Sequence, residues 1–146
     1  MFRFIPSIFL LVFASLTQLT SYAFVGSLKP NLTLVVLLVI SIIYKDWLRR
    51  ATLIFLAALL LKFGQGLEVQ NVMFILSALL GIFLIDRIPS IKFVNLVLAV
   101  IVSTLTINIT NFEAWTVFTE MLYNLIVALL LFTIYRLWLG KYEKNQ

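Results

Sequence analysis

Apolar residues fall into six runs along the 146-residue chain, and short polar breaks separate one run from the next. The runs lack the strict alternation of apolar and polar positions that a half-buried β-strand shows, so the pattern predicts helices and an all-α fold. Several runs hold about 17 residues, which is the lower limit for a helix that crosses a membrane. The predicted helices cover about residues 4–25, 30–46, 47–63, 69–85, 93–110 and 114–139.

The break between the third and fourth runs is a short glycine turn. Gly64 and Gly66 leave the backbone free to reverse direction, and Lys62 and Glu68 flank the turn with opposite charges. If both neighbouring runs cross a membrane, this turn is a tight hairpin loop at one surface.

The composition predicts one integral membrane domain over residues 1–146. Hydrophobic residues make up 63% of the chain, charged residues make up 12%, and the mean hydropathy is +1.12. A soluble domain of this length could not bury so much apolar surface. The lipid bilayer is therefore the expected surrounding of a six-transmembrane-helix bundle.

The chain contains no cysteine and no histidine. Disulfides, thiolate metal sites and histidine-based acid–base chemistry are thereby excluded, so we expect no cofactor and no enzymatic activity. The net charge of +5 comes from positive residues scattered singly along the chain, which is not the basic face that nucleic-acid binding requires.

The distribution of lysine and arginine predicts the orientation in the membrane. Nine of these residues fall at the chain termini and in the breaks after the second and fourth runs, whereas Lys29 and Lys62 alone fall on the opposite side. Because cytoplasmic loops carry the excess of positive charge, we expect a multi-pass protein with both termini in the cytoplasm.

Two features of the first half of the chain allow another interpretation. The first run resembles a signal peptide, with Arg3 before an apolar stretch over residues 5–16 and a small-residue cleavage pattern over residues 21–23. The second and third runs are short, and they could form a shallow hairpin in a protein with five spans. An uncleaved first helix and six spans are the preferred interpretation.

Polar residues within the apolar runs are the candidate functional residues. Ionisable groups inside a membrane are costly, so Glu120 and Lys62 are candidates by their position alone. We expect Glu120 to face the bundle, supported by Asn124 one turn further on and by Lys62. Gln18 and Asn108 fall in the outer halves of their helices and complete a candidate intramembrane polar cluster. The cluster either lines a cavity open to the outside or forms hydrogen bonds between helices.

Two pairs of small residues at a spacing of four predict close helix packing. Ser77 and Gly81 lie in the fourth run, and Ala99 and Ser103 lie in the fifth run. Small residues at this spacing allow two helices in a membrane to approach each other closely.

Several short segments resemble the rod shape-determining protein MreD family of bacteria. They are Leu16-Thr-Gln, Lys29-Pro-Asn-Leu followed by Leu34-Val-Val-Leu-Leu-Val-Ile, Phe55-Leu-Ala-Ala-Leu-Leu-Leu-Lys-Phe-Gly-Gln-Gly, and Leu79-Leu-Gly. Asn31 stands where the family has an aspartate, and Lys62 stands where it has an acidic residue. The resemblance implies a non-enzymatic scaffold subunit of the peptidoglycan elongation complex in the bacterial inner membrane. Its implied partners are a single-span protein of the MreC type and other members of that complex.

A second family shares the same general layout. Substrate-binding subunits of energy-coupling-factor transporters also have about six helices, cytoplasmic termini and an outward pocket. Their coupling helices commonly carry Ala-xxx-Ala spacing, and neither Ala14 in the first run nor Ala57 and Ala58 in the third run has an alanine four residues later. This family is the alternative interpretation.

Overall fold

The computed structural model describes residues 4–20, 30–61, 68–89 and 91–143, with side chains to Leu137. Within these ranges the chain forms six α-helices and one short 3-10 helix, with no strand, so the predicted all-α fold is confirmed. The helices are α1 (Phe4–Leu19), α2 (Leu32–Ile43), α3 (Trp47–Leu60), α4 (Val69–Arg87), α5 (Lys92–Ile107), the 3-10 helix η1 (Ile109–Asn111) and α6 (Ala114–Glu143).

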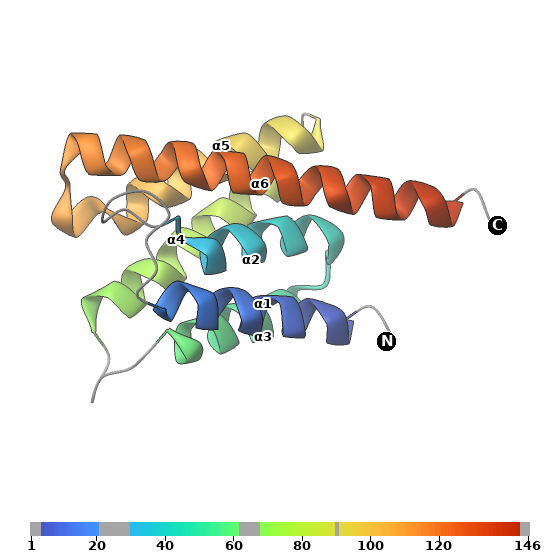
Figure 1. Ribbon diagram of the computed structural model, residues 1–146, viewed down its shortest axis with the longest axis horizontal. Helices are drawn as coiled ribbons and strands as arrows, with labels where there is room; N and C mark the ends of the chain where they lie inside the picture. The colour runs from blue at the N-terminus through green and yellow to red at the C-terminus, as the bar shows by residue number, and fades with distance from the viewer. Residues whose placement is uncertain (1–3, 21–29, 62–67, 90, 144–146) are drawn as a thin grey trace.

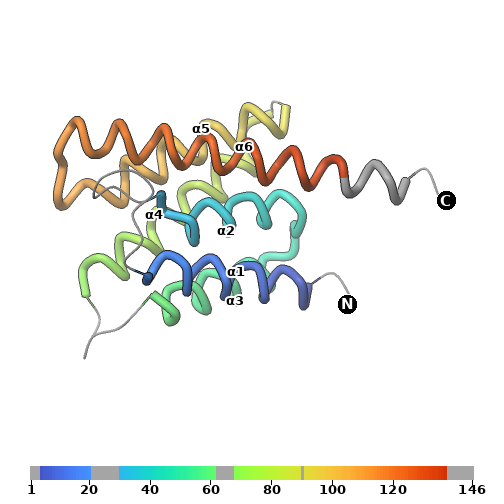
Figure 2. The backbone as a smooth tube through the Cα atoms, viewed as in Figure 1, coloured from blue at the N-terminus to red at the C-terminus, as the bar shows by residue number. Residues whose placement is uncertain are grey.

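Successive helices run in alternating directions, so the bundle has two ends (Figure 1; Figure 2). The C-terminal ends of α1, α3 and α5 meet the N-terminal ends of α2, α4 and α6 at one end, which we name the cavity end. The remaining helix ends meet at the other end, which we name the arginine end.

Helix α2 lies at the centre of the bundle and contacts each of the other five helices. All ten residues from Thr33 to Ile42 are buried, eight of them are leucine, valine or isoleucine, and none carries a charge. A helix with a polar face could not take this position, because every side of it packs against another helix. The second apolar run is therefore the core of the fold.

Local capping explains why α2 is shorter than the predicted range of 30–46. The side chain of Asn31 caps its start by accepting a hydrogen bond from the Leu34 N–H at 3.2 Å. The backbone of Tyr44 is extended and ends the helix after Ile43. Asp46 then caps α3 by accepting a hydrogen bond from the Leu48 N–H at 3.0 Å. The cap at Asn31 and the extended backbone at Tyr44 leave α2 with 12 residues, or about 18 Å.

The predicted end of the last helix at residue 139 is wrong, because α6 continues through Gly140 to Glu143. A glycine lowers helix stability but does not end a helix whose other hydrogen bonds continue. The 3-10 helix η1 lies between α5 and α6. Helix α5 therefore ends at Ile107, whereas its predicted end was residue 110.

Small residues lie where α4 and α5 pack against each other. Ser77, Ala99 and Ser103 are completely buried, and Ser103 Oγ donates a hydrogen bond to the Ser77 carbonyl oxygen at 2.8 Å. A Cβ atom added to Gly81 would lie 2.5 Å from Leu38 Cδ2 and closer still to Ser103 Oγ. The absent side chain of Gly81 is therefore what allows α2, α4 and α5 to meet.

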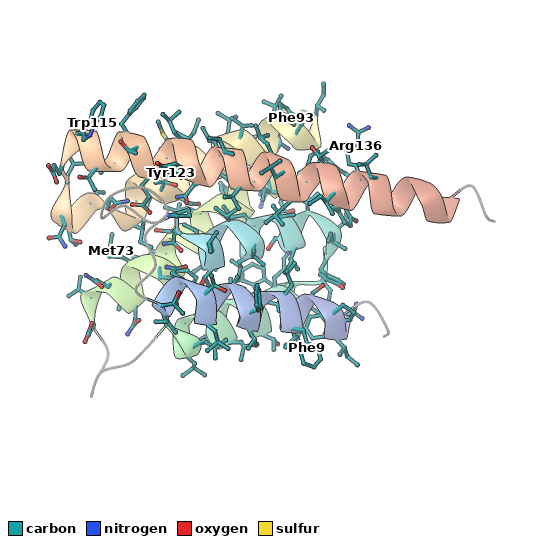
Figure 3. All side chains as sticks on the ribbon, in the orientation of Figure 1. Phe9, Met73, Phe93, Trp115, Tyr123 and Arg136 are labelled. Atoms are coloured by element: carbon teal, nitrogen blue, oxygen red, sulfur yellow. The ribbon has the colours of Figure 1, made fainter. Side chains whose placement is uncertain are left out.

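Large apolar side chains cover the outward faces of the helices (Figure 3). Phe9 on α1 and Trp115 on α6 are 69% and 72% exposed, and similar residues follow along α3, α4 and α5. Among the described helices, two are long and apolar enough to cross a membrane, over residues Val69–Arg87 and Ala114–Leu137.

Candidate functional site

Polar side chains from four helices meet around the N-terminus of α2 at the cavity end. The Asn31 backbone N–H donates a hydrogen bond to Asn124 Oδ1 on α6 at 2.7 Å. Asn124 Nδ2 donates in turn to Thr104 Oγ1 on α5 at 2.9 Å, and Asn124 is completely buried. A single asparagine therefore connects α2, α5 and α6 where no water can replace its hydrogen bonds.

Helix α1 satisfies a second backbone group at the same place. Gln18 Oε1 accepts a hydrogen bond from the Thr33 N–H at 2.9 Å, and Thr33 Oγ1 donates to Ser15 Oγ at 3.3 Å. The first N–H groups of a helix have no partner within the helix itself. Side chains of α1 and α6 thus supply the acceptors that allow α2 to begin inside the bundle.

Glu120 lies on α6 one turn before Asn124 and faces the cavity end of the bundle. Its Oε2 accepts a hydrogen bond from Asn108 Nδ2 at 2.9 Å, and the same amide nitrogen donates to the Thr104 carbonyl oxygen at 2.9 Å. The structure thus brings Glu120, Asn108, Asn124 and Gln18 together. Lys62, the fifth member of the predicted cluster, lies outside the described residues, so its pairing with Glu120 stays a prediction.

A polar cavity of about 330 Å³ opens between these helices. Its side chains are mostly amides and hydroxyls, and Glu120 is the one charged residue that lines it within the described ranges. The lining residues are Gln18, Leu19, Asn31, Leu61, Gln70, Asn71, Phe74, Ile107, Asn108, Thr110, Asn111 and Glu120. Such a cavity can hold water or a small polar molecule, since its volume is at the low end for ligand sites.

Asn71 near the start of α4 also lines the cavity and is 8% exposed. Its side-chain amide adds both donor and acceptor groups to the cavity wall.

A buried arginine organises the opposite end of the bundle. Arg50, near the start of α3, is 3% exposed and forms a two-pronged ion pair with Asp86 at the end of α4. Its remaining donors reach the carbonyl oxygens of Tyr44 and Ser41, which end α2. One guanidinium group therefore connects α2, α3 and α4.

The apolar pattern counted Arg50 only among the basic residues that set the orientation, and it did not indicate that Arg50 is buried or that it pairs with Asp86. Arg50 lies in the first turn of α3 directly before an apolar stretch, and the rotation of that helix turns it inward rather than outward. One feature of the sequence could have indicated this pair. Asp86 and Arg50 lie at the same predicted end of two neighbouring apolar runs.

An aromatic cluster attaches the start of α1 to the end of α2. Phe4 and Tyr44 pack edge to face with ring centroids 5.6 Å apart, and Tyr44 OH lies 3.1 Å from Ser7 Oγ. The Arg49 guanidinium lies 5.9 Å from the centroid of each ring. These contacts complete the arginine end with a cation–π arrangement.

Comparisons of this chain with protein-family models, with curated proteins and with solved structures give no match. Within the described part of the chain, no three acidic residues come close enough to hold a metal ion.

Proposed function

We propose that the chain is a multi-pass membrane protein in which all six helices cross the bilayer. The belt of exposed apolar side chains around α1, α3, α4, α5 and α6 supports this placement, because soluble monomers rarely expose apolar patches of this extent. The short α2 is compatible with a span since other helices surround it on all sides. Its ends open toward the polar cavity and toward the arginine end rather than toward lipid tails.

The orientation that follows has the arginine end and both termini in the cytoplasm. A reporter that is active only in the cytoplasm should work when it is fused after Gln146 and should fail when it is inserted at Gln65. Activity at both positions would contradict the six-span arrangement, because these positions lie on opposite sides of it.

The function that we propose is that of a non-enzymatic scaffold subunit of a cell-wall elongation complex, as the resemblance to the MreD family implies. The observation that carries it is an apolar ridge that winds along the exposed side of α6. The ridge consists of Phe118, Leu122, Ile126, Leu130 and Ile134, which follow one another at a spacing of four and are 43–63% exposed. Ridges at this spacing are what a second helix packs against. A single-span partner of the MreC type would lie along this ridge.

Co-purification of a single-span partner from the native membrane tests the scaffold function. Alanine at both Ile126 and Leu130 is expected to lower recovery of the partner several-fold, because the middle of the ridge loses its large apolar side chains. The matched control replaces Phe9 and Phe13 on α1, which are each 69% exposed, by alanine. This double variant should leave recovery unchanged. Equal losses in the two variants would reject the α6 ridge as the interface.

A second candidate function is substrate binding for an energy-coupling-factor transporter. The cavity at the proposed outer end favours it, since its side-chain amides and the Glu120 carboxylate would suit a small polar ligand with a cationic group. The co-purification experiment also separates the two functions. Recovery of an ATPase pair together with a tightly bound small molecule would replace the scaffold function with transport.

A further inference from the structure

A groove of about 400 Å³ opens at the arginine end between α2, α3, α4 and α5. It is distinct from the polar cavity, which lies at the opposite end of the bundle. The residues that line it are Ile42, Lys45, Arg50, Ile85, Asp86, Ile88, Lys92 and Asn95. Basic, amide and branched apolar side chains thus share one groove.

The groove carries a net positive charge. Arg50, Lys45 and Lys92 supply three cationic groups, and Asp86 supplies the one carboxylate. Because Asp86 is already paired with Arg50, the two lysines are the charges left to attract an anion. Both lysines are exposed. Together they can neutralise a group with about two negative charges, or hold one phosphate diester by strong charge-assisted hydrogen bonds.

The N-terminus of α5 adds to the same field. Lys92 is the first residue of this 16-residue helix, and its first turn contains no acidic residue. The first N–H groups of such a helix favour an anion. The helix end therefore acts in the same direction as the two lysines.

Apolar side chains form the rest of the groove. Ile42 lines it from α2 and Ile85 from α4, and Ile88 follows the end of α4. Asn95 is unable to offer its amide nitrogen to a ligand, because Nδ2 already donates to the carbonyl oxygens of Ile85 and Ile88 at 3.2 and 2.8 Å. A ligand that fits has a phosphate for the lysines and an alkyl part for the isoleucines.

We propose that this groove binds the phosphate headgroup of an anionic glycerophospholipid from the cytoplasmic leaflet. Basic pockets between membrane helices on the cytoplasmic side are suited to such headgroups. The proposal depends on the membrane placement above, but not on the scaffold function, since a scaffold and a transport subunit would hold the lipid alike.

The test uses the full chain in nanodiscs of phosphatidylcholine that contain a limiting fraction of phosphatidylglycerol, with bound lipid measured by native mass spectrometry after release. Lys45→Gln and Lys92→Gln should each weaken phosphatidylglycerol retention about fivefold, and the double variant about 30-fold. Arg136→Gln is the matched control, because Arg136 is an exposed cation of α6 that does not line the groove (Figure 3). All variants should melt at the wild-type temperature in pure phosphatidylcholine, since the two lysines are exposed.

Selective loss in the lysine variants supports the proposal. An equal loss in Arg136→Gln would overturn it, because general surface charge would then explain the retention. Displacement of the lipid by millimolar glycerol phosphate, with the same dependence on Lys45 and Lys92, would also overturn it in favour of a soluble phosphate ligand. Failure of the partner to co-purify would leave these results unaffected, so the two proposals fail separately.

Discussion

Replacement of Arg50 by methionine is expected to destabilise the protein by about 2–3 kcal/mol, because buried carbonyl oxygens lose a charged donor while the remaining Asp86 carboxylate is 46% exposed and can be solvated. The substitution keeps an unbranched apolar side chain and removes every donor. Asp86 loses its partner, and the Tyr44 and Ser41 carbonyl oxygens lose theirs at the end of the central helix. The measurement is the free energy of unfolding in detergent, followed by helical circular dichroism.

Arg49 provides the control for this prediction because it is the neighbouring arginine on the same helix. Its ion pair with Asp46 spans 3.2 Å, and both side chains are about half exposed. Such surface pairs contribute at most about 1 kcal/mol, so Arg49→Met should be mild. Combining Arg50→Met with Asp86→Leu should cost less than the sum of the single changes, by about 1–3 kcal/mol. Additive effects would contradict the coupling of Arg50 to Asp86.

Gly81→Ala is expected to destabilise the protein by about 1–3 kcal/mol through overpacking, and Gly81→Val by more. At an unhindered helix position the same change to alanine would stabilise by up to about 1 kcal/mol. The opposite sign is expected here because the new Cβ would overlap Leu38 Cδ2 and Ser103 Oγ, and both residues are completely buried. Thermal unfolding in detergent measures the effect.

Truncation of the obstructing side chain should partly restore stability. The double variant Gly81→Ala with Leu38→Ala is expected to be more stable than the sum of the single effects indicates, since the added methyl group fills part of the space that Leu38 leaves. Leu80→Ala, one position earlier on the same helix but 43% exposed, serves as the control for a general effect of changing α4. Strict additivity would show that the close approach at Gly81 does not limit packing.

The hydrogen bonds at the two ends of the bundle show where sequence reasoning succeeded and where it stopped. The pattern placed Gln18, Asn108, Glu120 and Asn124 at one end, because helix ends and direction follow from breaks in the apolar runs. It did not distinguish a cavity from hydrogen bonds between helices, and the structure contains both.

The sequence by itself determined the number of helices, their class and where each begins to within about two residues, because these depend on local properties. Apolar runs without alternation give helices, and residues such as Asn31 and Asp46 cap them through contacts within three residues. Only the tertiary structure decided which helix lies at the centre and which side chains meet. Arg50 and Asp86 are 36 residues apart, and Asn31 and Asn124 are 93 residues apart. Helices that are apolar all round, such as α4 and α6, do not indicate how each is rotated about its own axis, and that rotation selects the partners.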